Sequence, residues 1–152
     1  MTAPARSTEL RKHDTLNRLV NDVDCWVATA EPGTAEPYLV PLSYFWDGLT
    51  LLIATATSSP TAQNLLASQK VRLGIGTTRD VVLIEGRVRS FPSSQITAEL
   101  GDAFAKKTGF DPRVSRGSYT YFTVIPRRIQ AWREENELKD REIMSNGVWT
   151  VL

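Results

Sequence analysis

The sequence predicts a mainly β domain with flanking helices, in which six or seven short antiparallel strands form a closed or partly closed barrel. Two observations support this fold class. Runs rich in β-branched and aromatic residues recur along the chain with turn residues between them, and only two sizeable segments repeat apolar residues at helical spacing. The periodicity by itself fits a two-sheet sandwich as well as a barrel.

Length and composition narrow the class of protein. We expect one domain over residues 1–152, in which residues 1–7 form a flexible leader, because 152 residues is an ordinary size for a single core. Lys and Arg number 18 against 17 Asp and Glu. This balance argues against the broad basic surface that binds nucleic acid or anionic membranes. We therefore expect a small-molecule partner.

Single residues and apolar runs exclude other classes. Cys25 cannot close an internal disulfide and is expected to be a buried thiol, and His13 has no second metal ligand beside it and is expected at the surface. Residues 49–56 form the longest apolar run, far short of the ~20 residues of a membrane-spanning helix. Because the start of the chain has no signal-peptide pattern, the protein is expected to be cytoplasmic. Because Cys25 and His13 have no further ligands near them, it is expected to bind no metal.

The first half of the chain predicts a helix and three strands. A helix over 8–22 is expected to cover the barrel with an apolar face. The members of that face are Leu10, Leu16, Leu19, Val20 and Val23. Strands are expected over 25–30, 38–46 and 49–56. Asp47-Gly48 predicts a type I′ hairpin between the last two strands, because that turn needs positive φ at both positions.

Local signals then predict the next helix and hairpin. Ser59 is expected to be the N-cap and Pro60 the first residue of a short helix that continues over 61–68. The runs 71–76 and 81–91 predict a hairpin around the four residues between them.

The last third predicts a second full helix and two more strands. Residues 94–107 carry apolar residues at steps of four, and Gly109 follows them as a stop signal. Strands are expected over 119–125 and 129–134, interrupted by Pro126. The tail ends in an apolar cluster with no predicted structure.

The most informative segment is 54–65, where a strand passes through a hydroxyl-rich turn into a helix. The first turn of a helix offers unpaired N–H groups and a positive dipole end, both of which favour a phosphate. Hydroxyls of Ser58, Ser59 and Thr61 and amides of Gln63 and Asn64 could add donors. The alternative is that these hydroxyls only cap the helix.

Aromatic and arginine residues add two weaker signals. Aromatic residues such as Trp132 could form a flat wall for a planar cofactor ring, although core packing is the alternative for each of them. Arginines such as Arg79 could bind phosphate or carboxylate groups, although most are expected to be solvated surface charges.

The order of several short motifs is familiar. They are Tyr38-Leu39-Val40-Pro41-Leu42-Ser43, Thr57-Ser58-Ser59-Pro60-Thr61 with Asn64-Leu65, Val71-Arg72-Leu73, Thr78-Arg79-Asp80-Val81-Val82, Glu85-Gly86-Arg87-Val88 and the run from Ile125 to Trp132. Over residues 8–135 the sequence resembles the pyridoxamine 5′-phosphate oxidase-like family of FMN-binding split barrels, within it the small flavin- or deazaflavin-dependent oxidoreductases. The resemblance implies a split β-barrel and a homodimer with two cofactor sites at the subunit interface, each holding FMN or, alternatively, a deazaflavin coenzyme.

The resemblance also implies which residues contact the cofactor. The expected set is Pro41, Leu42, Ser43, Thr55, Ala56, Thr57, Ser58, Ser59, Thr61, Gln63, Asn64, Arg79 and Trp132. By this analogy 41–43 would border the ring system, 55–59 would follow the ribityl chain, and Thr61 and Asn64 would lie at the phosphate. Trp132 would wall the site, from the same or the second subunit.

The expected function is an oxidoreductase acting on a small unsaturated or carbonyl substrate, with no catalytic side chain evident. The alternative is a non-catalytic carrier or sensor of a flavin, a deazaflavin or haem on the same fold. One departure from the family bears on both: Gln63 stands where many members carry a basic residue, and a neutral donor binds phosphate less strongly. A third possibility is a dimeric scaffold that binds no flavin.

Overall fold

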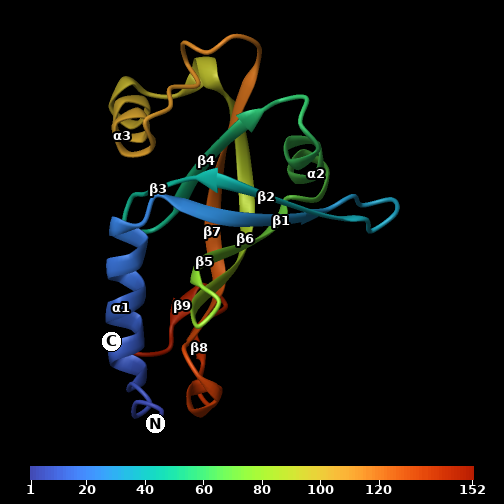
Figure 1. The fold of residues 1–152 in the computed structure, drawn as a ribbon. Helices are drawn as coiled ribbons and strands as arrows, with labels where there is room; N and C mark the ends of the chain where they lie inside the picture. The colour runs from blue at the N-terminus through green and yellow to red at the C-terminus, as the bar shows by residue number, and fades with distance from the viewer.

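The computed structural model describes residues 1–152 as one curled antiparallel sheet with three helices on its outside (Figure 1). The strand order is β2-β1-β5-β6-β7-β4-β3, with β8 paired to β7 and β9 paired to β8. The strands are β1 (Asp24–Ala30), β2 (Pro37–Ser43), β3 (Phe45–Trp46), β4 (Leu51–Ala56), β5 (Lys70–Thr77), β6 (Asp80–Pro92), β7 (Tyr119–Trp132), β8 (Glu142–Ser145) and β9 (Val148–Trp149). The helices are α1 (Thr8–Asn21), α2 (Pro60–Ser68) and α3 (Ala98–Thr108), with short 3-10 turns at Ser93–Gln95 and Glu135–Glu137. The mainly β split-barrel prediction is confirmed, and β8 and β9 were not expected.

The helix α1 has the expected bounds but buries a different face. Its buried residues are Arg11, Thr15 and Leu19, whereas Leu10, Val20 and Val23 are exposed. The reason is Arg11, whose guanidinium donates to the carbonyl oxygens of Glu137, Lys139 and Asp140. The helix therefore packs partly through Arg11 against the carboxyl-terminal loop. Of the predicted apolar face, Leu16 and Leu19 do pack against the core, and the prediction was wrong for the other three.

The turn between β3 and β4 differs from the prediction by one residue. The Asp47 N–H donates to the Thr50 carbonyl, so Gly48-Leu49 is the centre of the turn, and of Asp47 and Gly48 only Gly48 has positive φ, at 101°. The Asp47 carboxylate accepts hydrogen bonds from the N–H groups of Leu49 and Thr50 at 2.8 and 2.6 Å. Asp47 thus stabilises the turn from its first position, before the two central residues, and the type I′ assignment to Asp47-Gly48 was wrong.

Pro126 lies inside β7, which is one strand of 14 residues instead of the two that were expected. The pairing of β6 with β7 shifts between Glu85 and Gly86, which face Arg128 and Pro126, so Arg127 is an extra residue in a β-bulge. A bulge tolerates proline because the ladder is already interrupted there.

The ends of α2 and α3 follow local capping signals. Ser59 caps α2 and Pro60 is its first residue, as predicted. The α3 helix begins at Ala98, four residues later than expected, because the Thr97 hydroxyl accepts the Leu100 N–H and caps it there. It ends as expected at Gly109, which has left-handed φ.

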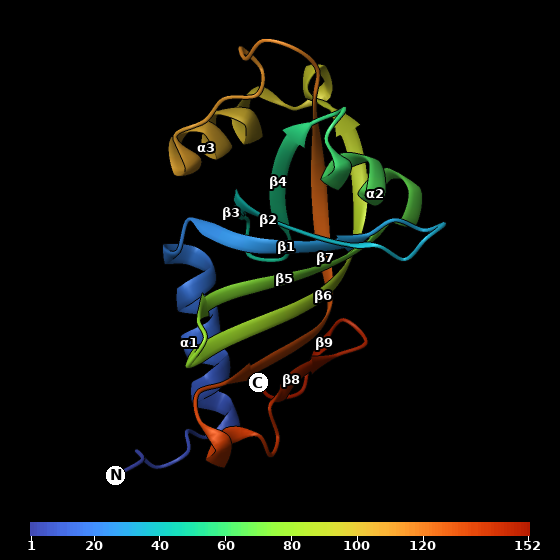
Figure 2. The ribbon, with the colours of Figure 1, turned by 45° about the vertical axis from the view of Figure 1, so that its right-hand side comes forward.

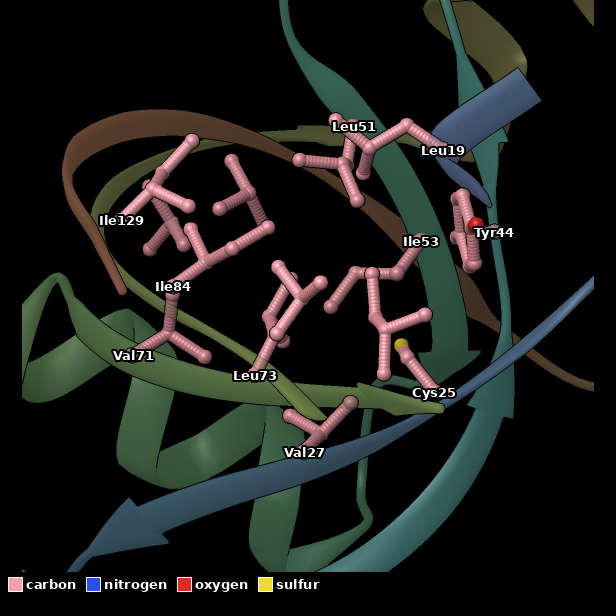
Figure 3. Packing of buried hydrophobic residues seen from close by; sticks show 14 of the residues in the cluster. Leu19, Cys25, Val27, Tyr44, Leu51, Ile53, Val71, Leu73, Ile84 and Ile129 are labelled. Carbon is pink, nitrogen blue, oxygen red and sulfur yellow. The ribbon is translucent and has the colours of Figure 1, made fainter. Parts of the chain in front are cut away.

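The main core lies inside the curl of the sheet. Side chains from α1 and from the central strands converge there, including Leu19, Cys25, Val27, Ile53 and Ile84 (Figure 3). Burial, together with the negative charge of Asp24, raises the pKa of the Cys25 thiol to about 12. The expected buried thiol is confirmed.

The amino-terminal segment contacts the end of the chain. Arg6 donates from its backbone N–H and its guanidinium to Glu137, and the Ala3 carbonyl accepts from Asn136. The flexibility expected of residues 1–7 stays a prediction, but the last of them are held by these contacts. None of the helices is long and apolar enough to cross a membrane.

Candidate functional site

The predicted phosphate cradle, residues 55–64, lies where β4 ends and α2 begins. The Ser59 hydroxyl accepts the Ala62 N–H at 3.1 Å and lies 3.2 Å from the Thr55 hydroxyl. The Thr57 hydroxyl lies 2.8 Å from that of Thr120 on β7. Most hydroxyls of the cradle are therefore bonded within the chain.

The two amides expected at the phosphate also have partners. Gln63 donates from Nε2 to the Thr57 carbonyl at 2.7 Å, and Asn64, which is 8% exposed, donates from Nδ2 to the Thr29 hydroxyl at 3.1 Å. Thr61 is buried, and its backbone N–H has no partner within the chain. Because Thr61 is only 1% exposed, that N–H is not open to solvent. The exposed Ser58 hydroxyl is therefore what the cradle offers to an anion, and no cation lies in the first turn of α2.

The segment expected to border a ring lies on β2. In the ladder with β1, Pro41 pairs with Trp26 and Leu42 with Cys25, and the Ser43 hydroxyl donates to the Asp24 carboxylate at 2.6 Å. Because α2 packs against β1, β2 and β4, the strand that holds this segment contacts the helix of the cradle.

Arg79 and Trp132 belong to a second group, at the other end of the sheet. β5 leads from the end of α2 to the hairpin that holds Arg79, and its 8 residues span about 25 Å at ~3.3 Å per residue. Both ribbon views place α2 and the tip of this hairpin far apart (Figures 1 and 2). Trp132 pairs with Val81 beside the hairpin. One chain therefore does not bring the predicted set together.

Both residues of this second group have partners. The Arg79 guanidinium forms an ion pair with Glu134 at 2.6 Å, and the pair is largely exposed. The Arg141 guanidinium lies over the Trp132 ring, 5.3 Å from its centroid.

The structure contains two adjoining depressions that sequence reasoning missed. The outer groove, about 390 Å³, crosses the outer face of β1, β5 and β6, and its apolar side chains include Trp26, Leu39 and Leu83. The basic hollow, about 820 Å³, lies beside it, with Lys70, Arg87 and Arg127 in its lining. None of the predicted site residues lines either of them. The signal available in the sequence was the alternation along β1 and β6, which places Trp26 and Leu83 on the face opposite the core.

The protein has the fold of a split barrel: one curled antiparallel sheet, with helix α2 packed against β1, β2 and β4. Residues 21–134 match the family described as pyridoxamine 5′-phosphate oxidase, and the chain belongs to that family. No curated protein matches the sequence.

Several solved structures share the fold. A structure named F420 reductase is 18% identical, with a TM-score of 0.59, and the match covers 74% of this chain and 93% of that one. An FAD-binding protein from Mesorhizobium loti is 17% identical, with a TM-score of 0.62 and coverage of 85% and 96%. General stress protein 26 from Bacillus anthracis is 15% identical, with a TM-score of 0.58 and coverage of 81% and 95%. At these identities the likeness is one of fold.

Proposed function

We propose that the protein is an oxidoreductase that binds FMN or a deazaflavin coenzyme and acts on a small unsaturated or carbonyl substrate as a homodimer. Membership of the pyridoxamine 5′-phosphate oxidase family supports a flavin. The names of two similar structures, F420 reductase and an FAD-binding protein, point in the same direction.

The observation that carries the proposal is the separation of the expected site into two groups. The cradle lies at one end of the sheet, and Arg79 and Trp132 lie at the other end, a β5 length of about 25 Å away. A second copy of the chain that places its own Arg79 and Trp132 against the cradle would complete the site. In that arrangement each cofactor lies at the subunit interface.

The residues of the cradle fit a phosphate group as neutral donors. The exposed Ser58 hydroxyl would donate to it, and the positive end of the α2 dipole would add to the attraction. The 41–43 segment would border the ring system. A bound flavin supplies the transfer of hydride or electrons, while the protein orients it and excludes water.

A second candidate is a non-catalytic protein that carries or senses a flavin, a deazaflavin or haem. The observation in its favour is the small number of free donors in the cradle, in which the Gln63 amide is bonded to the Thr57 carbonyl and the first turn of α2 contains no cation. Turnover of bound cofactor with a nicotinamide or a reduced deazaflavin as donor would separate the two candidates, since a carrier shows none.

The first test is a titration of the purified protein with FMN and with coenzyme F420, followed by quenching of cofactor fluorescence. We expect micromolar binding of one of them, and Ser58→Ala should weaken it about fivefold, the effect of one neutral hydrogen bond of ~1 kcal/mol. The control is Ser94→Ala, an exposed serine in the turn before α3. Ser59→Ala should in addition destabilise the fold by about 1 kcal/mol, because it removes the N-cap.

The dimer is tested with the same preparation. Sedimentation should give twice the mass of one chain, and Arg79→Gln should weaken cofactor binding while the exposed Arg116→Gln should not. Binding of neither cofactor would refute the oxidoreductase proposal. A monomer that binds cofactor normally would refute the shared site.

A further inference from the structure

We propose that the basic hollow binds the anionic group, a phosphate or a carboxylate, of a ligand whose flat apolar part lies in the outer groove. This goes beyond the proposed function, because every lining residue belongs to one chain and none belongs to the predicted cofactor cradle.

The positive charge of the hollow is compensated only in part. Its lining contains four cationic side chains and two carboxylates, those of Glu31 and Glu85. Glu85 is already paired with Arg72 and Arg128. Lys70, Arg87 and Arg127 form no ion pair and no side-chain hydrogen bond. Three cations around one depression repel one another, and an anion placed among them would relieve that repulsion.

Two features of the backbone fix Arg127 in the lining. Arg127 is the extra residue of the β-bulge in β7, and its carbonyl accepts the Gly147 N–H from the β8–β9 turn. A Cβ on Gly147, which has φ of 79°, would lie 3.1 Å from the Arg127 Nη1. The turn therefore leaves room for this guanidinium beside it. Lys70 and Arg87 face each other across the β5–β6 ladder.

The outer groove continues the hollow along the same strands. The two depressions share Ala28, Arg72 and Glu85, so they form one continuous surface. Trp26 is 52% exposed and Leu39 59% exposed, which is unusual for large apolar side chains that neighbour each other across two strands. An apolar floor that leads to unpaired cations fits a planar molecule with an anionic tail.

The experiment is calorimetric titration of the full-length protein with three probes. They are 1-naphthyl phosphate, which has both parts, 1-naphthol, which has the flat part alone, and inorganic phosphate. We expect naphthyl phosphate to bind at least tenfold more tightly than either of the others, and its affinity to fall as salt is raised. Naphthol that binds as tightly as naphthyl phosphate would overturn the proposal.

Variants locate the binding. Arg127→Gln and Arg87→Gln should each weaken naphthyl phosphate about tenfold and leave naphthol unchanged, because each removes a bond between two charged groups. The matched control is Arg89→Gln, which lies on β6 two residues from Arg87, is exposed, forms no ion pair and does not line the hollow. Equal effects of the three variants would mean general attraction by surface charge and would overturn the proposal. The absence of any naphthyl phosphate binding would also overturn the proposal. The outer groove would then be a surface that another protein chain covers.

The anionic group could come from a substrate or from the cofactor itself, and saturation with FMN separates these sources. If naphthyl phosphate still binds beside FMN, the hollow belongs to a substrate. If FMN displaces it and Arg127→Gln weakens FMN where Ser58→Ala does not, the hollow holds the phosphate of the cofactor. A failure of flavin binding with naphthyl phosphate binding intact would refute the proposed function and leave this inference standing.

Discussion

Two arginine-rich regions of this molecule use charge in opposite ways. In the first, which we name the terminal clasp, Arg6, Arg18 and Arg133 are interleaved with Asp14, Asp80 and Glu137. In the second, the basic hollow, Lys70, Arg87 and Arg127 have no carboxylate within ion-pair distance. Each region thus has three cations of this kind, but those of the clasp are paired with carboxylates and those of the hollow are not.

The burial of the two regions differs as well. In the clasp the Arg6 and Glu137 side chains are 7% and 3% exposed, and the Glu137 carboxylate accepts four hydrogen bonds, three from Arg6 and one from the Arg133 N–H. Charges removed from water require such complete pairing. The cations of the hollow stay exposed, and their hydration makes pairing unnecessary. The comparison indicates that the clasp stabilises the fold and that the hollow is available to a ligand.

The largest effect on stability is expected from a substitution that removes the buried carboxylate of the clasp. Glu137→Gln should lower the free energy of unfolding by about 3 kcal/mol, because it removes the main counter-charge of the buried Arg6 guanidinium, which keeps only its pairs with Asp14 and, at 3.9 Å, Asp80. Denaturant unfolding measures this loss. The control is Glu134→Gln, which removes the exposed pair with Arg79 and should cost less than ~1 kcal/mol. Equal losses in the two variants would contradict the structural role of the clasp.

Protonation of Glu137 at low pH should break the same contact between Arg6 and Glu137. The Arg6 guanidinium lowers the pKa of Glu137 from 4.5 to about 2. Because the folded state holds this carboxyl ionised, its contribution to stability is present above about pH 4.5 and is lost as the pH falls toward 2. A pKa lowered to that extent corresponds to about 3 kcal/mol. Unfolding curves between pH 6 and 2 should show this loss in the parent protein and a flatter profile in Glu137→Gln. Parallel profiles would mean that other carboxyl groups carry the acid sensitivity.

The features that could be predicted from the sequence are those whose causes lie within a few residues. Ser59 and Pro60 start α2, and Gly109 ends α3, because caps and left-handed glycines act through their own turn. Runs rich in β-branched and aromatic residues between turn residues likewise identified most strands, and together with the family motifs they predicted the correct fold class.

The features that could not be predicted depend on residues far apart in the chain. Arg6 and Glu137 meet across 131 positions, and no local pattern shows that Arg11 rather than Leu10 is buried in α1. In the cradle, the amide of Asn64 on α2 donates a hydrogen bond to Thr29 on β1, 35 positions earlier in the chain. The basic hollow depends on the bulge at Arg127, which exists only once β6 and β7 are paired.

The smallest expected effect comes from a substitution in the basic hollow, and it tests whether the cations of the hollow contribute to folding. Arg127→Gln should change the free energy of unfolding by less than ~0.5 kcal/mol, the usual range for an exposed side chain without a specific contact. At low salt the change should be a slight gain, because the variant removes repulsion from Lys70 and Arg87, and the gain should vanish at high salt as screening removes that repulsion. Denaturant unfolding in about 20 mM and about 500 mM salt measures both. A loss greater than ~1 kcal/mol would show that Arg127 supports the fold as Arg6 does, because an exposed cation that is poised for a ligand contributes little to folding.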